Sequence, residues 1–352
     1  MSGSRPLDIA MVSTPWYELP PVAYGGIESM CAALVDGLVE RGHQVTVIGV
    51  GSNGTKGRFV AVDDTPRGEQ LGSAGPEVLH AARVARILRG LHPDVIHDHS
   101  TAGPLQAGQR PAPTVMTAHG PVSGETGDYY RALGDTVHLV AISHAQREQA
   151  PDIPWSGQVH NAVRTLDHPF REHKGDRALF LGRIAADKGV HLAIDAARRA
   201  GVPITVAGRC NGPEERLYLE REILPRLGED AHWVGEADLR VKLDLLARAR
   251  CLLFPICWEE PFGMVMIEAM ACGTPVVALR RGSVPEIVEH GVTGYICDHP
   301  AELADAVRCV DRLSPRACRR RVLEHFDTAQ MTSGYASLYQ LLAERQRLRA
   351  AA

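Results

Sequence analysis

Short runs of β-branched and aliphatic residues alternate with segments of helical periodicity along almost the whole chain, and this alternation restricts the possible folds more than any other feature. The first half contains "LDIAMVS", "HQVTVIGV", "DVIHDH", "TVMTAHG" and "HLVAIS", and the second half "RALFLGR", "PITVAGR", "CLLFPI" and "TPVVAL". Strands that are buried on both faces and separated by helices form parallel sheets of βαβ units. The sequence therefore predicts an α/β protein that binds ligands at the carboxyl ends of its strands.

The domain organisation follows from length and from one interruption of this rhythm. A chain of 352 residues suits two domains better than one core. The polar segment 164–176, "RTLDHPFREHKGD", is the best linker candidate. We therefore expect two similar Rossmann-like domains, 1–164 and 165–326, that face a cleft. The last segment, 327–352, reads as a helix that packs back on the N-terminal domain, with its apolar face formed by Met331, Tyr335, Leu338 and Leu342.

Composition excludes several classes of protein. No run of eighteen apolar residues occurs and the amino end is polar, so we expect a cytoplasmic protein without a membrane span or secretory signal. A net charge of −4 gives no indication of nucleic-acid binding. The eight cysteines include no C-x-x-C pair, and several lie in apolar runs, so disulfides and a zinc site are not expected.

The segment 49–54, "GVGSNG", has the G-x-G-x-x-G spacing of a dinucleotide site and follows a strand. The next residues, "TKGRFVAV", favour a loop and another strand over the helix that would hold a pyrophosphate. A nicotinamide cofactor is therefore a minor alternative.

Two segments are better candidates for binding phosphate. In "YGGIES", Gly25 and Gly26 precede a clear helix, whose free N–H groups favour an anion; the alternative is a tight turn without a ligand. In "GRIAADKG", Arg183 and Lys188 share one short loop at the carboxyl end of a strand. Two cations there suit a diphosphate, although such side chains in a loop are often simply solvated.

The strongest local signal is the stretch "CWEEPFGMVMIEAMACGTPVV", in which an apolar helix carries one carboxylate, Glu268. A buried carboxylate needs partners, and we expect the partner to be a ligand; the alternative is a buried ion pair with a structural arginine. Glu268 lies about 7 Å along the helix from its start, a reach that suits a ribose diol when phosphates sit at the helix start. Glu260 precedes the turn and would bind sugar hydroxyls. The N–H groups directed at the ligand would be those of Gly263, Met264 and Val265.

Histidines end two of the predicted strands. In "VIHDHS" the cluster of His97, Asp98 and His99 lacks a further ligand at suitable spacing, which disfavours a metal site. His119 in "MTAHGP" is either a core histidine or a residue that meets a sugar hydroxyl or a phosphate oxygen.

Taken together, "YGGIES", "MTAHG", "GRIAADKG", "EEPFGMVMIEAMACGTPVVA" and "GSVPEIVEHGVTGYI" resemble the retaining glycosyltransferases of family 4, which have the GT-B fold. The resemblance covers about residues 7–345, and its most specific part is the Glu-x7-Glu signature formed by Glu260 and Glu268.

The resemblance implies roles for the residues quoted. Glu268 would hold the donor ribose, and Arg183 and Lys188 would neutralise the diphosphate as the glycosidic bond breaks. Glu260 would fix the donor sugar together with the backbone of Phe262 and Gly263, and His119 would reach that sugar from the other domain. Gly25 and Gly26 would contact the diphosphate and border the acceptor.

The same resemblance implies a reaction: transfer from a UDP- or GDP-sugar to a hydroxyl of a small-molecule, glycan or lipid-linked acceptor, with retention of configuration. The sequence has no Asp-x-Asp, so we expect neither a metal ion nor another cofactor. Two alternatives on this evidence are a sugar-nucleotide epimerase or hydrolase and an NAD-dependent oxidoreductase. A membrane-surface role, suggested only by Arg83, Arg86 and Arg89 beside an apolar helical face, is possible but not indicated.

Overall fold

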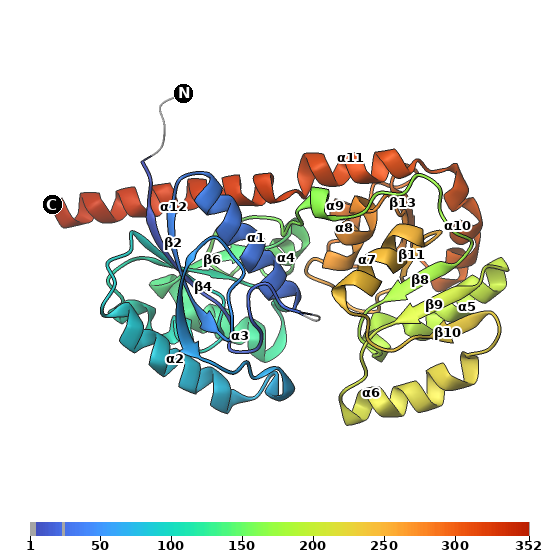
Figure 1. The fold of residues 1–352 in the computed structure, drawn as a ribbon, viewed down its shortest axis with the longest axis horizontal. Helices are drawn as coiled ribbons and strands as arrows, with labels where there is room; N and C mark the ends of the chain where they lie inside the picture. The colour runs from blue at the N-terminus through green and yellow to red at the C-terminus, as the bar shows by residue number, and fades with distance from the viewer. Residues whose placement is uncertain (1–4, 23–24, 352) are drawn as a thin grey trace. The chain divides into compact units, whose positions relative to one another are not determined.

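The computed structural model describes residues 5–22 and 25–351 and forms two compact units (Figure 1). The N-terminal unit runs to Ala162 and resumes at Thr328, and the C-terminal unit is Val163–Asp327. The N-terminal unit is therefore discontinuous in sequence. The predicted domain ends at residues 164 and 326 lie close to these divisions at 162 and 327.

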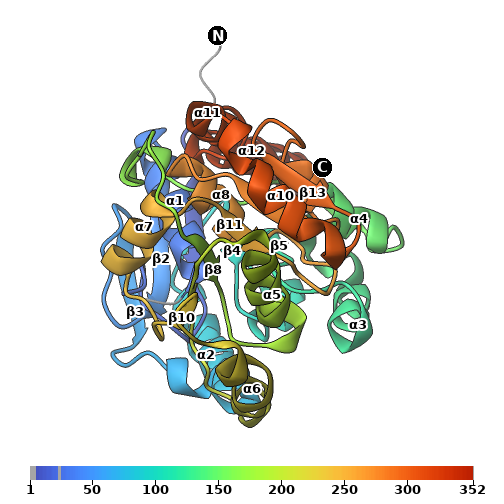
Figure 2. The ribbon, with the colours of Figure 1, turned by 90° about the vertical axis from the view of Figure 1, so that its right-hand side faces the viewer.

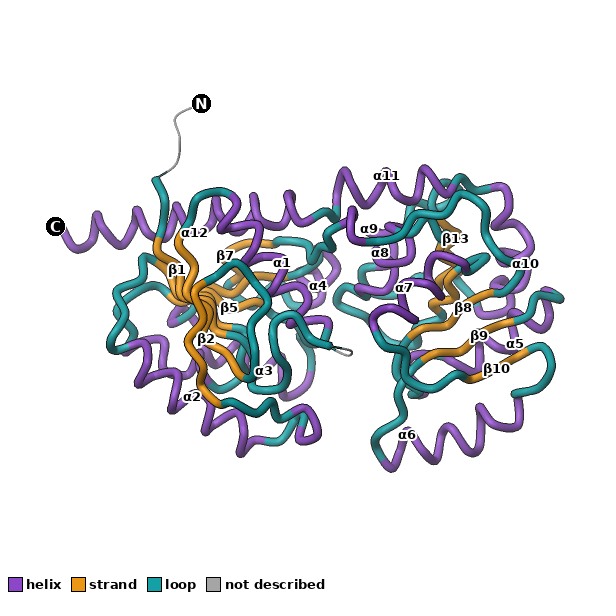
Figure 3. Tube along the Cα trace, in the orientation of Figure 1, coloured by secondary structure: helices purple, strands orange, loops and turns teal. Residues whose placement is uncertain are grey.

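The N-terminal unit is built on a seven-stranded sheet of order β3-β2-β1-β4-β5-β6-β7. Its neighbouring strands pair in parallel. They are the orange segments of the tube in Figure 3. The strands are β1 Asp8–Val12, β2 Gln44–Val50, β3 Arg58–Asp63, β4 Val95–Asp98, β5 Thr114–Thr117, β6 His138–Ala141 and β7 Trp155–Gln158.

Helices cover this sheet, and the last helix of the chain is one of them. The helices are α1 Gly26–Glu40, α2 Ala74–Leu88, α3 Gly124–Leu133, α4 His144–Gln149 and α12 Thr328–Ala351. Helix α12 packs along α1 (Figure 1). Its residues Met331, Tyr335 and Leu342 are buried in the same hydrophobic cluster as Leu34 of α1, and Leu338 packs at the edge of that cluster. Packing of its apolar face thus holds α12 on the N-terminal unit, although α12 lies far from the rest of that unit in sequence.

The C-terminal unit contains a six-stranded parallel sheet of order β10-β9-β8-β11-β12-β13. The strands are β8 Ala178–Leu181, β9 Ile204–Ala207, β10 Ala231–Trp233, β11 Leu252–Phe254, β12 Val276–Leu279 and β13 Gly294–Cys297. The helices are α5 Val190–Ala200, α6 Pro213–Tyr218, α7 Leu239–Arg248, α8 Met264–Ala271, α9 Val284–Ile287, α10 Leu303–Cys309 and α11 Pro315–His325. Helices α5 and α10 contact each other over one face of this sheet (Figure 2).

The prediction of two parallel α/β domains is confirmed, and each quoted apolar run contains a strand. Four strands were not among those runs: β3, which was predicted separately from "TKGRFVAV", and β7, β10 and β13, which were not predicted. All four lie at sheet edges. Strands β7 and β10 are partly exposed, so they lack the continuous apolar pattern of a central strand. Strand β13 is mostly buried but spans only the four residues Gly294–Cys297.

Two further predictions concern the N-terminal unit. The segment after "GVGSNG" leads from the end of β2 at Val50 into β3 at Arg58, as predicted, so no helix begins there. In α2, Arg83 pairs with Asp63 at 2.7 Å.

Among the described residues, no helix is both long and apolar enough to cross a bilayer.

Candidate functional site

The loop that follows β8 carries Arg183 and Lys188 and is held tightly against a second loop. Gly189, which ends this loop and caps α5, has a φ of 70°, and a β carbon there would lie 2.0 Å from the carbonyl oxygen of Pro255. The backbone N–H of Cys257 donates to the carbonyl of Asp187 at 2.8 Å. Only glycine fits this crossing, and the contact brings the predicted cation loop next to the segment that holds Glu260.

Lys188 and Glu260 form an ion pair in this arrangement. Lys188 Nζ donates to Glu260 Oε2 at 2.5 Å, and both side chains are mostly buried, with 17% and 15% exposed. The same ammonium lies 5.0 Å from the ring centroid of Trp258, a cation–π distance. The structure thus joins two of the predicted site residues and adds Trp258, which sequence reasoning missed.

Arg183 lies beside them but is neutralised within the unit. Its guanidinium donates to Glu215 at 2.7 Å and lies 3.4 Å from Asp187. Burial raises the pKa of Glu215, but the Asn211 backbone N–H and the Arg183 guanidinium together outweigh it and leave that pKa below its usual value. Sequence reasoning missed Glu215, and Arg183 is not the unpaired cation that the loop suggested.

Helix α8 begins where the sequence predicts. Gly263 is its N-cap with a φ of 77°, and the helix runs from Met264 to Ala271. The N–H groups of Met264 and Val265 have no acceptor inside the helix, as at any helix start. Ser283 fixes the turn that precedes the helix through two hydrogen bonds. Its Oγ donates to the Phe262 carbonyl at 2.6 Å, and its backbone N–H donates to the Glu260 carbonyl at 3.0 Å.

Glu268 has an internal partner, which corrects the expectation that only a ligand would satisfy it. Lys242 Nζ on α7 donates to Glu268 Oε1 at 2.8 Å. Burial raises the pKa of Glu268, but the charge and hydrogen bond of Lys242 outweigh this and keep the pKa below its usual value. The residue is also less enclosed than predicted, because it shares a partly exposed helix face with Met264 and Val265. The alternative, a buried ion pair, is therefore what the structure shows, with a lysine in place of the arginine considered for it.

In the N-terminal unit, Gly25 and Gly26 stand at the start of α1 as predicted. Gly25 has a φ of 145°, and a β carbon there would lie 2.8 Å from Pro21 and 2.9 Å from Glu28 Oε2, so its backbone requires glycine even without a ligand. Burial raises the pKa of Glu28, which accepts a hydrogen bond from Thr14 Oγ1. Sequence reasoning missed this buried carboxyl beside the predicted anion site. Tyr24 and Ala23 lie outside the described residues.

His119 follows β5 and contacts His99, the buried residue that follows β4. Its Nε2 lies 2.9 Å from Nδ1 of His99. Burial lowers the pKa of His119 to about 4, so the ring is neutral at pH 7. His97 contacts Tyr339 and Thr117, and Asp98 pairs with Arg110 at 2.6 Å. The "HDH" residues are therefore engaged by side chains of their own unit.

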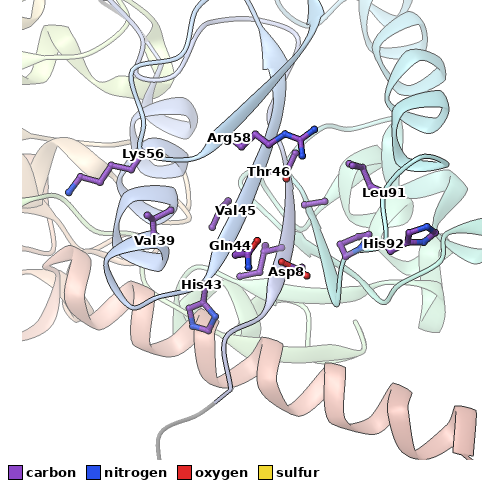
Figure 4. Close-up of a pocket in the computed structure, with 13 residues that line it drawn as sticks. Asp8, Val39, His43, Gln44, Val45, Thr46, Lys56, Arg58, Leu91 and His92 are labelled. Atoms are coloured by element: carbon purple, nitrogen blue, oxygen red, sulfur yellow. The ribbon is translucent and has the colours of Figure 1, made fainter.

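A hollow of about 460 Å³ in the N-terminal unit lies elsewhere (Figure 4). Asp8 and Gln44, which line it, are the first residues of β1 and β2, so the hollow opens at the amino ends of these strands. In open α/β sheets ligands bind at the carboxyl ends. None of the predicted site residues lines this hollow.

Comparison with known proteins agrees with the arrangement described above. The sequence model of the family described as Glyco_transf_4, Glycosyltransferase Family 4, matches residues 24–165, and that of Glycosyl transferases group 1 matches residues 166–317. A glycogen synthase of Mycobacterium tuberculosis is 29% identical over 400 residues, which cover 96% of this chain and 95% of that protein.

Solved structures share the fold over nearly the whole chain. Sucrose-phosphate synthase from Thermosynechococcus elongatus superposes with a TM-score of 0.76 at 18% identity, covering 99% of this chain and 100% of that one. HepE of Anabaena, solved in complex with UDP and glucose, has a TM-score of 0.72 at 19% identity and covers 94% of this chain and 98% of that one.

Proposed function

Because the chain belongs to the family 4 glycosyltransferases of GT-B fold, we propose that it transfers a sugar from a nucleoside diphosphate donor to a hydroxyl acceptor, with retention of configuration and without a metal ion. The observation that carries the proposal is the contact between Lys188 and Glu260, which joins the cation loop to the Glu-x7-Glu segment. A UDP- or GDP-sugar is the proposed donor, and HepE, which was solved with UDP and glucose, has the same fold.

The two cations of the loop after β8 act on the leaving diphosphate in this proposal. Lys188 and Arg183 are each paired with a carboxylate, Glu260 and Glu215. A diphosphate carries more negative charge than a single carboxylate, so it replaces each carboxylate as the partner of its cation, and neither cation is left without a counter-charge. The positive charges then stabilise the oxygen that gains negative charge as the glycosidic bond breaks, which is the work a metal ion would otherwise do.

Glu268 binds the donor ribose while it keeps its internal partner. The bond from Lys242 uses Oε1, which leaves Oε2 for a hydroxyl donor. A lysine at this distance also keeps the carboxylate ionised, so the bond to the ribose hydroxyl is charge-assisted. Lys242 is thus compatible with ligand binding by Glu268 rather than opposed to it.

The remaining roles concern the sugar. Glu260 is released from Lys188 when the diphosphate arrives and then accepts hydrogen bonds from hydroxyls of the donor sugar. The backbone of Phe262 and Gly263, at the start of α8, binds the same sugar. His119 contributes a further contact to the sugar. Gly25 and Gly26 contact the diphosphate, and the Glu28 carboxyl, whose pKa is raised by burial, lies beside them.

A thermal-shift screen of UDP, GDP, ADP, NAD and NADP tests the donor half, since a ligand that binds only the folded state raises the unfolding temperature. Protection by UDP or GDP that persists in EDTA supports the proposal; protection by NAD alone would contradict it. Incubation of the matching nucleotide sugar with and without candidate acceptors then separates transfer from the alternative activities, because a hydrolase or epimerase consumes the donor alone.

A further inference from the structure

A series of polar contacts runs through the buried side chains behind His119. Nδ1 of His99 lies 2.9 Å from Nε2 of His119. The other ring nitrogen of His99, Nε2, lies 3.3 Å from the sulfur of Met11. Met11 is fully buried and His99 is 5% exposed, so water does not compete for either contact.

The chemistry of Met11 sets the direction of these bonds. A thioether has no hydrogen to donate, so Nε2–H of His99 must be the donor in that contact. Burial holds the pKa of His99 well below its usual value, so the ring carries a single proton. Nδ1 of His99 is then unprotonated and carries a lone pair, and Nε2–H of His119 donates to it.

The same reasoning fixes the outer nitrogen of His119. Burial lowers the pKa of His119 to about 4, so at pH 7 this ring also carries one proton, which Nε2 holds. Nδ1 of His119 is left as a bare acceptor, and among residues 5–22 and 25–351 no hydrogen-bond partner for it is found.

We propose that Met11 and His99 are positioning residues that hold His119 in the tautomer with a bare Nδ1, so that His119 accepts a hydrogen bond from a sugar hydroxyl. Phosphate and carbonyl oxygens present lone pairs and are repelled by this nitrogen, whereas a hydroxyl donates to it. The tautomer is independent of the proposed function; only the identification of the hydroxyl as that of the donor sugar rests on it.

Neighbouring contacts prevent other arrangements of the two rings. Both nitrogens of His97, whose ring centroid lies 3.9 Å from that of His99, are engaged, by Tyr339 at 2.5 Å and Thr117 at 2.9 Å. His97 is therefore not a competing partner for His99. Gln146 Nε2 donates to the carbonyls on both sides of His119, Ala118 at 2.8 Å and Gly120 at 2.9 Å, which fixes the backbone from which the ring projects.

Nitrogen NMR of the intact protein labelled with ¹⁵N-histidine tests the tautomer without any assay of activity. The His119→Gln variant identifies the His119 signals by their loss. The expected result at pH 7.5 is a protonated Nε2 and an unprotonated Nδ1. A protonated Nδ1 on His119, or an imidazolium, would overturn the proposal.

Variants test the two positioning residues. Met11→Leu conserves volume but removes the sulfur acceptor, so the Nδ1–H form of His119 should become measurably populated. His99→Leu should have the same effect, whereas His99→Asn, whose amide oxygen accepts from Nε2–H, should restore the original tautomer. The signals of the exposed His232 should not move. If His119 keeps one tautomer in both Met11→Leu and His99→Leu, neither residue positions it.

Kinetics with modified donors test the hydroxyl. A deoxyfluoro donor carries fluorine, which does not donate a hydrogen bond, in place of one sugar hydroxyl. When the replaced hydroxyl is the one that His119 binds, kcat/KM should be about tenfold lower than with the normal donor in the wild type. In His119→Ala the two donors should differ little. Equal discrimination in both proteins refutes the hydroxyl contact. A failure of the proposed function would appear differently, as an absence of transfer from every donor alongside an unchanged NMR result.

Discussion

Lys242 on α7 and Glu268 on α8 are joined by a hydrogen bond of 2.8 Å, with 22% and 13% of their side chains exposed. The pair is 26 residues apart in sequence. It ties together two helices of the C-terminal unit and at the same time occupies one oxygen of the carboxylate that we assign to the donor ribose.

Breaking this pair from either end separates its structural role from ligand binding. Glu268→Ala and Lys242→Ala should each lower the free energy of unfolding by about 1–3 kcal/mol. Glu268→Ala should also weaken binding of UDP or GDP by about thirtyfold or more, and by more than Lys242→Ala, because only Glu268→Ala removes the acceptor of the ribose hydroxyls. Calorimetric titration of both variants measures this. Equal losses of affinity would mean that the carboxylate serves the fold alone.

Replacing Lys188 with alanine should reduce kcat/KM by about 10²–10³, the cost of losing one charged contact to a developing negative charge. The free energy of unfolding should also fall, by about 1–3 kcal/mol, because the mostly buried Glu260 loses its partner. Arg198→Ala is the matched control, since it removes another cation of the same unit, paired with Asp230 at 2.8 Å. A Lys188→Ala variant as active as Arg198→Ala would contradict the role of this lysine.

Gly189 and Gly201 provide a matched pair for the loop crossing. Their φ angles are 70° and 71°, but a β carbon at Gly189 meets Pro255 and one at Gly201 meets no atom within 4 Å. Both alanine variants carry the same backbone strain, about 1 kcal/mol. Gly189→Ala should lose additional stability and most activity, because it displaces the segment that leads to Glu260. Parallel urea unfolding and transfer assays compare them; identical behaviour would show that the crossing tolerates displacement.

Acid should destabilise the N-terminal unit through His119. The folded-state pKa of His119 is about 4, below its ordinary value of 6.5, so the unfolded chain binds a proton first as the pH falls. The stability due to the neutral ring is complete above pH 6.5 and is lost as the pH falls towards 4. Relative to His119→Gln, the wild type should therefore lose stability between pH 6.5 and 4 in denaturant titrations. A constant difference across that range would contradict the assignment.

Lys174 should give a pH dependence of the same sign at the alkaline end. It donates to the carbonyls of Ala247 at 2.9 Å and Cys272 at 2.8 Å, near the ends of α7 and α8. Burial lowers its pKa from 10.5 to about 8. Between these values the unfolded chain holds more protons, so stability rises with pH. The stability of the wild type relative to Lys174→Met should increase from pH 8 to 10.5, as measured by urea unfolding; a decrease would reverse the assigned shift.

The sequence predicted the elements of this protein better than the partners of its charged side chains. Alternating apolar runs identify central strands because both faces of such strands are buried, and Gly263 marks the start of α8 because its φ is positive. Glu215 and Lys242 lie 32 and 26 residues from the residues they pair with. Such pairings depend on how helices and loops pack, and neither spacing nor composition records that.

His99 illustrates the same limit within the site. The motif "HDHS" indicated a cluster of polar residues at a strand end and disfavoured a metal site, but it assigned no role to His99. Its contacts with Met11 and His119 cross three adjacent strands of one sheet. Strand order therefore had to be known before a role for this ring could be inferred.

The return of α12 to the N-terminal unit has a consequence for synthesis. Helix α12, whose buried residues include Tyr335 and Tyr339, completes a core that otherwise comes from the first 162 residues, whereas Val163–Asp327 is continuous. On the ribosome the later unit can thus finish folding first, while the earlier one waits with apolar side chains uncovered until its closing helix emerges. A nascent chain that stalls before α12 is made should accordingly bind chaperones through its N-terminal unit rather than through Val163–Asp327.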